Sequence, residues 1–229
     1  MDKPKEDTGL DQYRTRGAFT VAGVRGDSET QGMEAEFAKA HLALKALDRD
    51  REDLEETVQE HEAVIVWLDR SCDRIIRSFE LRALDVVSKK RDDPRYRRYF
   101  PEGLRAVTET DERAVQPKLV RGILAALDED KEKPEFAPLH AEFHAKLLAA
   151  VQAVEAADAA CTKVEDELGY LVDRKIAEAK TRWLEERTKL HAELTKKFPH
   201  DPARVESYFR RFARPRKKKA ASKPEAGDK

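Results

Sequence analysis

Apolar residues recur at alternating steps of three and four over a long stretch that contains neither proline nor glycine. Counted from Leu44, thirteen such positions between Met33 and Lys90 include ten apolar residues. This heptad pattern is typical of a helix that packs along one stripe, and it predicts a long α-helix over 33–91. A lone helix of this composition is unstable in water, so the stripe requires a partner. The positions are Leu44, Leu47, Arg51, Leu54, Val58, His61, Ile65, Leu68, Cys72, Ile75, Phe79, Arg82 and Val86.

A second stripe of the same kind predicts another long helix over 136–197. Its apolar positions advance by one residue after Leu171, which indicates a local change of packing and not the end of the helix. The stripe consists of Phe143, Leu147, Ala150, Val154, Ala157, Cys161, Val164, Leu168, Leu171, Val172, Ile176, Ala179, Trp183, Leu190 and Leu194.

Asp-Pro pairs follow both long helices and predict short helical elements. Aspartate is a good N-cap and proline suits the first helical position, so we expect a short helical turn over 94–100 and a short helix over 202–212. Pro117 similarly opens an amphipathic helix over 117–131. The connection between the long helices is too short for an extended return, so we expect them to run antiparallel.

Two segments at the ends of the chain lack a sustained hydrophobic period. Residues 1–30 are polar and punctuated by glycine, and residues 213–229 are a basic, low-complexity run, so both are expected to be disordered. Between them, the sequence predicts one elongated all-α domain over 31–212. Its predicted architecture is an antiparallel, coiled-coil-like hairpin of two long helices with one shorter amphipathic helix and two short capping helices.

The stripe of the first long helix widens around Val64, Trp67 and Ile76. A wide stripe is expected where more than one neighbour packs. Either the helix over 117–131 or a second copy of the chain could cover this face, and we favour a homodimer.

The composition favours long helices with a narrow apolar seam and disfavours a thick globular core. Charged residues make up 40% of the 229 residues and aromatic residues only 7%, which disfavours an enclosed substrate cavity. No run of apolar residues has the length of a membrane span, and the first residues do not resemble a signal peptide. Two isolated cysteines fit a reducing compartment, so we expect a cytoplasmic protein.

Candidate chemistry is sparse. His140 and His144 lie four residues apart, which places both imidazoles on one helical face, where they could hold a metal. No third ligand is marked by the sequence, so ordinary surface histidines are favoured and no metal or cofactor is predicted. His61 is interpreted as a hydrogen-bonded seam residue, and Cys72 and Cys161 as small buried apolar residues. Because no phosphate loop or nucleophile motif is present either, we expect a protein that is not an enzyme.

Arginines interleave with aromatic residues after both Asp-Pro pairs, which also indicates an internal repeat. Such segments can grip phosphate while stacking on bases, or anchor at an anionic membrane surface. The favoured alternative is that the aromatic rings fold back and plug the ends of the long helices. The candidate partner contacts are Arg95, Tyr96, Arg97, Arg98, Tyr99, Phe100, Tyr208, Phe209 and Phe212.

Charge is distributed unevenly along the chain. Residues 204–219 contain eight basic residues and one acid, and residues 220–229 sum to zero; because the whole chain carries −1, residues 1–203 carry −8. A short polycation can add salt-sensitive affinity for nucleic acid without sequence preference. The candidate anion contacts are Arg210, Arg211, Arg214, Arg216, Lys217, Lys218 and Lys219.

The sequence therefore predicts a non-enzymatic, rod-like interaction, scaffold or assembly protein. Its ends and flexible termini would contact a protein partner, which could be a second copy. The alternative is a nucleic-acid-associated protein that uses the basic C-terminal segment.

Overall fold

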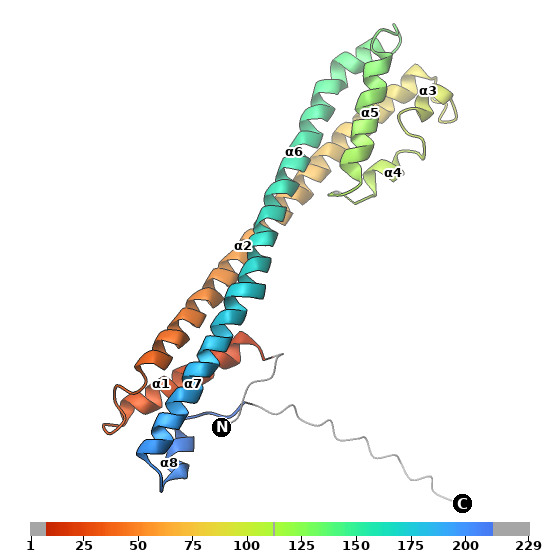
Figure 1. Ribbon diagram of the computed structural model, residues 1–229. Coiled ribbons are helices and arrows are strands. Elements are labelled where there is room, and N and C mark those ends of the chain that lie inside the picture. Colours follow the sequence, from red (N-terminus) through yellow and green to blue (C-terminus); the bar gives the residue numbers. More distant parts are fainter. Residues whose placement is uncertain (1–7, 112, 213–229) are drawn as a thin grey trace, which may run out of the picture. The chain divides into compact units, whose positions relative to one another are not determined.

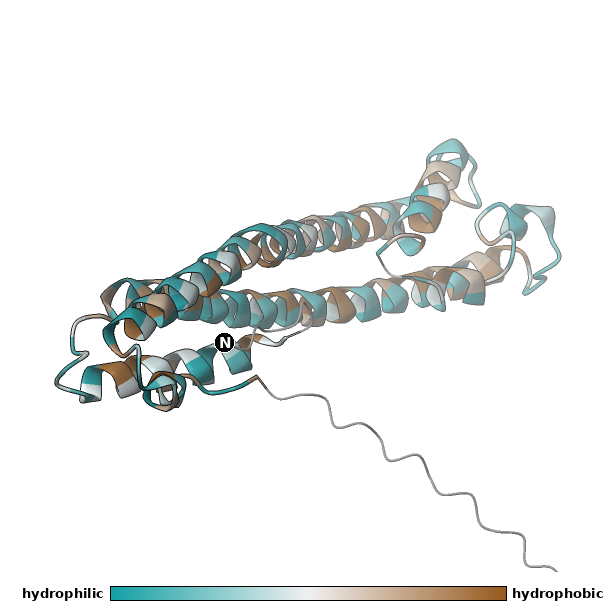
Figure 2. Cartoon of the chain, turned by 60° about the horizontal axis from the view of Figure 1, so that its bottom comes forward, coloured by the Kyte–Doolittle hydropathy of each residue, from teal (hydrophilic) through white to brown (hydrophobic). Residues whose placement is uncertain are grey.

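The computed structural model describes residues 8–111 and 113–212 (Figure 1). Every regular element in this part of the chain is helical, which confirms the all-α prediction. The first long helix is α2 (Ala35–Val86), with 52 residues. Hydrophobic and hydrophilic residues alternate along it, as Figure 2 shows, in keeping with a helix that buries one stripe.

The second long helical segment consists of α6 (Ala137–Tyr170), the π-helix η1 (Leu171–Ile176) and α7 (Ala177–Lys197). The π-helix lies where the apolar stripe shifts. Leu171 and Ile176 are buried, whereas Val172 is 40% exposed. A π-helix forms hydrogen bonds between residues five apart. It therefore brings Leu171 and Ile176, which are five residues apart, to one face. The predicted change of packing is confirmed, but the assignment of Val172 to the stripe was wrong.

The chain folds as two compact units. Of the described residues, 8–49 and 173–212 belong to unit 1, and those from Asp50 to Val172 belong to unit 2. Helix α2 begins in unit 1 and ends in unit 2, and η1 spans the second crossing.

In unit 2, α2 and α6 pack antiparallel, as predicted (Figure 1). The rings of Phe79 and Phe143 meet edge to face at 5.6 Å between centroids. Helix α5 (Gln116–Asp130) packs against α6, and the short helices α3 (Pro94–Arg97) and α4 (Arg105–Thr108) belong to the same unit. The core includes Ile76, Phe79, Ala83, Tyr99, Phe100, Val120, Ile123, Leu127, Phe136, Phe143, Leu147 and Val151.

Unit 1 is built around Trp183 of α7, which is fully buried. Its ring contacts Phe37 of α2 at 5.1 Å and Tyr13 at 5.0 Å, both edge-on. Tyr13 belongs to α1 (Leu10–Gly26), and the unit ends with α8 (Pro202–Ser207). Aromatic rings in edge-to-face contact supply both buried area and orientation preference, so they hold these helices in a defined register.

The prediction of disorder over 1–30 was wrong for residues 8–30, while residues 1–7 lie outside the described residues. Helix α1 buries a face with helical spacing whose members are mostly small or polar, including Arg16, Thr20 and Val24. Gly17 lies against His41, and a Cβ atom there would come within 2.3 Å of the His41 Nδ1 atom. Glycine therefore permits the close approach, although it weakens a helix in isolation.

Several predicted boundaries need correction. The first long helix was predicted over 33–91 but ends at Val86, where Ser88 and Lys89 adopt left-handed φ values of 55° and 63°. The Lys89 amide donates to the Leu84 carbonyl oxygen at 2.7 Å, which satisfies an orphan carbonyl at the helix end. The predicted elements over 94–100 and 202–212 are shorter, as α3 and α8. The predicted tail over 213–229 lies outside the described residues.

Candidate functional site

The two arginine-aromatic segments begin in the same way. We name residues 93–101 of unit 2 the first aromatic segment and residues 201–212 of unit 1 the second aromatic segment. The Asp93 carboxylate accepts the Arg95 amide at 2.8 Å, and Asp201 accepts the Arg204 amide at 2.9 Å. Both aspartates are followed by proline at the start of the helix. The predicted N-caps are therefore confirmed.

The first aromatic segment places its rings in the core of unit 2. Tyr96, Tyr99 and Phe100 are buried, and the Tyr99 ring meets Phe79 of α2 at 5.3 Å. The Tyr96 hydroxyl donates to the buried Glu80 carboxylate at 2.9 Å. Burial raises the pKa of Tyr96 to about 12, and the hydrogen bond to Glu80 adds to the shift. The buried Tyr96 hydroxyl and Glu80 carboxylate thus satisfy each other.

The arginines of this segment stay at the surface. Arg95 and Arg97 are exposed, and Arg95 forms an ion pair with its own cap Asp93 at 2.9 Å. Arg98 donates to the buried Asp130 carboxylate at 2.6 Å, and the Tyr99 hydroxyl donates to the same carboxylate at 2.7 Å. A buried carboxylate therefore joins the segment to the end of α5.

The second aromatic segment also places its rings inside, but beside buried cations. Tyr208, Phe209 and Phe212 are buried. The guanidinium carbon of Arg187, which is also buried, lies 5.2 Å from the Phe209 ring centroid and 5.3 Å from that of Phe212. Arg16 lies over Phe212 at 4.1 Å. Such cation–π contacts are strongest where water is excluded.

One carboxylate ties the second segment to the connection between α1 and α2. Asp27 accepts Arg204 at 2.6 Å and the Tyr208 hydroxyl at 2.5 Å. The hydrogen bond from Tyr208, followed by that from Arg204, lowers the pKa of Asp27 to about 2. The carboxylate is therefore held ionised well below its usual range.

These contacts confirm that the aromatic rings fold back onto the long helices. All six candidate aromatic residues are committed to the interior of their own units and present little surface to a partner. Of the candidate anion contacts, Arg210 and Arg211 are exposed. The others, Arg214, Arg216, Lys217, Lys218 and Lys219, lie outside the described residues.

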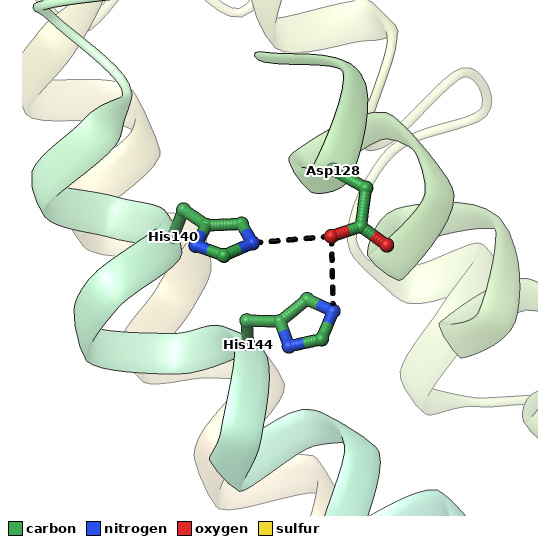
Figure 3. A group of neighbouring side chains, drawn as sticks. All are labelled: Asp128, His140 and His144. Carbon is green, nitrogen blue, oxygen red and sulfur yellow. Dashed lines mark hydrogen bonds and ion pairs between the residues drawn. The ribbon is translucent and has the colours of Figure 1, made fainter. Parts of the chain in front are cut away.

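The histidine pair at the start of α6 faces a carboxylate of α5 (Figure 3). The Nε2 atoms of His140 and His144 lie 3.1 and 3.2 Å from the same oxygen, Oδ1 of Asp128. The two imidazole rings stack at 4.7 Å between centroids. The ligand atoms of all three residues lie within 4.8 Å of one another. Asp128 is the third group that the sequence did not mark, because it comes from a different helix.

This cluster is one of several polar contacts between α6 and the segment around α5. Arg121 pairs with Glu155 at 2.6 Å, and Arg113 with Glu165 at 2.9 Å. The hydrogen bond from His140 is the main cause of a lowered pKa of Asp128. All three residues of the cluster are at least partly exposed, so a small ion can reach them.

An uncovered apolar face lies on the part of α2 that belongs to unit 2. Trp67 is 63% exposed and Val64, one helical turn earlier, is 49% exposed, whereas Ile76 is buried. Part of the widened stripe predicted here is therefore buried in the unit 2 core, and the part around Val64 and Trp67 is open. A tryptophan and a valine on the same face of a helix are neighbours.

The remaining candidates are the two cysteines and His61, and their surroundings indicate no chemical role. Cys72 and Cys161 are free and buried, and burial raises the pKa of Cys72 to about 12 and also raises that of Cys161. Both therefore remain thiols at neutral pH and are poor nucleophiles. His61 is half-buried on α2.

No protein-family model, curated protein or solved structure matches this chain. Among the described residues, no helix is both long enough and apolar enough to span a bilayer. The function must therefore be inferred from the chain's own residues.

Proposed function

We propose that this chain is a non-enzymatic helical interaction protein, and that it associates with a second copy of itself through the α2 face around Trp67. The observation that carries the proposal is the exposure of Trp67, at 63%, beside Val64. Tryptophan is the residue type most enriched among the dominant contacts of protein interfaces. An exposed Trp-Val pair on a rigid helix would make such a contact with little loss of side-chain freedom on binding.

A second copy is the partner that the packing favours. The widened stripe requires a covering element, and within unit 2 Ile76 is buried whereas Val64 and Trp67 remain at the surface. A two-fold contact lets the same face cover itself, as in most soluble homo-oligomers. The aromatic segments, which the sequence had offered as contact sites, bury their rings and so favour a contact surface elsewhere.

The test is the concentration dependence of the molar mass, measured by sedimentation equilibrium. Wild-type protein is expected to form a dimer, and Trp67→Ala to shift it to monomer by at least tenfold in dissociation constant, or about 1.4 kcal/mol. Val66→Ala is the control, because Val66 is also on α2 and is 41% exposed, but it lies about 100° around the helix from Trp67. A wild-type protein that stays monomeric, or a dimer that Trp67→Ala leaves intact, would refute the proposal.

Fluorescence gives an independent measurement on the same face. Trp67 and Trp183 are the two tryptophans of the chain, so a Trp183→Phe variant reports on Trp67 alone. Its emission should shift to shorter wavelength, and quenching by acrylamide should fall, as concentration rises through the dimer range. Unchanged emission across that range would place the contact away from Trp67.

The second candidate is a nucleic-acid-associated protein, favoured by the eight basic residues over 204–219. Arg210 and Arg211 are exposed and could contact phosphate. Binding of this kind weakens steeply with salt, because phosphate contacts release counterions. A titration with duplex DNA at low and moderate salt tests it, with deletion of 213–229 as the matched variant. Absence of salt-dependent binding, or no loss on deletion, would exclude this candidate.

A further inference from the structure

We infer that Asp128, His140 and His144 form a binding site for a divalent transition-metal ion of the zinc type. The site lies within unit 2, between the last turn of α5 and the first turns of α6 (Figure 3). It goes beyond the proposed association, since neither the Trp67 face nor the dimer depends on it.

Two of the three ligand-to-ligand distances are close to those around one shared ion, and all three ligand atoms lie within 4.8 Å of one another. Ligand atoms about 2.1 Å from a tetrahedral zinc ion lie about 3.4 Å from one another. The two Nε2 atoms lie 3.1 and 3.2 Å from the Asp128 oxygen, so movements of a few tenths of an ångström would bring them to that spacing. Imidazole nitrogen with one carboxylate oxygen is a donor set that suits zinc and its neighbours, in preference to calcium or magnesium.

The helices hold the ligands in place before any ion arrives. His140 and His144 are one turn apart on α6, so both imidazoles leave the same face of the helix. The residues that precede Asp128 and His144 in sequence, Leu127 of α5 and Phe143 of α6, are buried in the unit 2 core. Ligands on packed helices lose little freedom on binding, which favours affinity.

The arrangement of two histidines also differs from a simple ion pair. In unit 1, the His191 Nε2 atom lies 2.9 Å from Glu206, and one imidazole serves one carboxylate. At the α5–α6 site, two stacked imidazoles converge on a single oxygen. Two imidazole nitrogens and one carboxylate oxygen that converge in this way can hold a dication. The partial exposure of all three residues leaves the remaining coordination positions to water.

Titration of the metal-free full-length protein with zinc chloride by calorimetry tests the site. We expect one ion per chain, and we expect loss of binding in the His140→Ala/His144→Ala variant. Asp128→Asn should weaken binding by roughly tenfold or more, because the amide oxygen carries no charge. His191→Ala is the matched control, since it removes a histidine that pairs with one carboxylate, and it should bind as wild type does.

Cobalt provides a second measurement that does not depend on heat. Cobalt bound through imidazole should show visible d–d absorption. Added zinc should displace the cobalt and abolish that absorption, and so should acid, because protons compete with the metal for the imidazole nitrogens. Far-UV circular dichroism establishes that each variant is folded. Absence of saturable binding to folded wild-type protein, or binding retained by the double histidine variant, would overturn the inference. Failure of dimerisation with zinc binding intact would refute only the proposed function.

Discussion

The two aromatic segments share a sequence pattern but bury charges of opposite sign. In unit 2, the first segment surrounds the carboxylates of Glu80 and Asp130, which accept tyrosine hydroxyls. In unit 1, the second segment surrounds the guanidinium group of Arg187, which lies among phenylalanine rings. Tyrosine carries a hydroxyl that can donate to a buried carboxylate, while the face of phenylalanine attracts a cation.

The comparison teaches which part of the pattern determines local structure and which part depends on packing. The Asp-Pro start determines the cap in both segments, whereas the buried charge comes from a distant element: α2 and α5 in unit 2, and α7 in unit 1. Tertiary packing, and not the local motif, therefore determines which charge is buried beside each segment. The following substitutions address the interior of each segment first and the shared caps afterwards.

The largest effect is expected for Arg187→Ala in unit 1. Arg187 is buried, and its guanidinium carbon lies 5.7 Å from the Trp183 ring centroid. Truncation removes the cation and leaves a cavity between rings, so we expect a loss of about 4 kcal/mol in the free energy of unfolding. Denaturant titration followed by Trp183 fluorescence in a Trp67→Phe background measures it. Arg182→Ala is the control, because Arg182 is an exposed arginine on the same helix, and equal effects of the two variants would contradict the buried-cation interior.

A somewhat smaller effect is expected for Asp130→Ala in unit 2. The substitution leaves the buried Tyr99 hydroxyl without its acceptor and Arg98 with only the exposed Glu129, so we expect a loss of about 3 kcal/mol. Glu129→Ala is the control, because Glu129 also pairs with Arg98 but is exposed. Denaturation followed by circular dichroism should separate the two variants. If Glu129→Ala costs as much as Asp130→Ala, the buried carboxylate is not what holds the segment.

The two N-caps should respond alike to substitution, because both aromatic segments begin with an Asp-Pro cap. Asp93→Ala and Asp201→Ala each remove a side-chain acceptor from the first helical turn and should cost about 1 kcal/mol. The measurement is the same denaturant titration, with Asp93→Asn and Asp201→Asn as variants that retain an acceptor. If removal of one cap costs no stability while removal of the other does, the shared motif has different roles in the two units.

The smallest effect concerns the pH dependence of unit 1. The folded pKa of Asp27 is about 2, against an ordinary value of 3.8. Because the folded pKa is the lower one, the ionised carboxylate stabilises unit 1 above about pH 4, and this contribution is lost as the pH falls through 3.8 towards 2. Trp183 fluorescence during acid titration measures it. Asp27→Asn should flatten the dependence between pH 4 and 2, and Asp11→Asn, on exposed α1 surface, should leave it unchanged.

The sequence predicted the long helices because their stabilising pattern is local. The stripe of α2 repeats over many turns without proline or glycine, and the stripe of α6 repeats over a similar length, so the period is visible in a single sequence. Helix α1 escaped prediction because its buried face contains Arg16, Gly17 and Thr20. Its stability depends on contacts such as the one between Gly17 and His41, which exist only once the fold has formed.

The candidate sites likewise divide into local motifs, which the sequence predicted, and contacts between distant residues, which it did not. The spacing of His140 and His144 was readable, but Asp128 joins them through the register of α5 against α6, which periodicity does not specify. The aromatic segments were recognisable as plugs, whereas their buried partners, Glu80 and Arg187, are remote in sequence. Local motifs are thus predictable, while groups assembled from several helices require the structure.

Protection of the aromatic segments is the central claim, and the five tyrosines of the chain provide a direct test. Tyr13, Tyr96, Tyr99 and Tyr208 are buried, whereas Tyr170 is 60% exposed. Hydroxyl-radical footprinting of the native protein with detection by mass spectrometry compares all five in one sample. Oxidation concentrated at Tyr170, with the other four protected until denaturant is added, is the predicted result. Oxidation of Tyr96, Tyr99 or Tyr208 at the rate of Tyr170 would contradict the assignment of these segments to the interior.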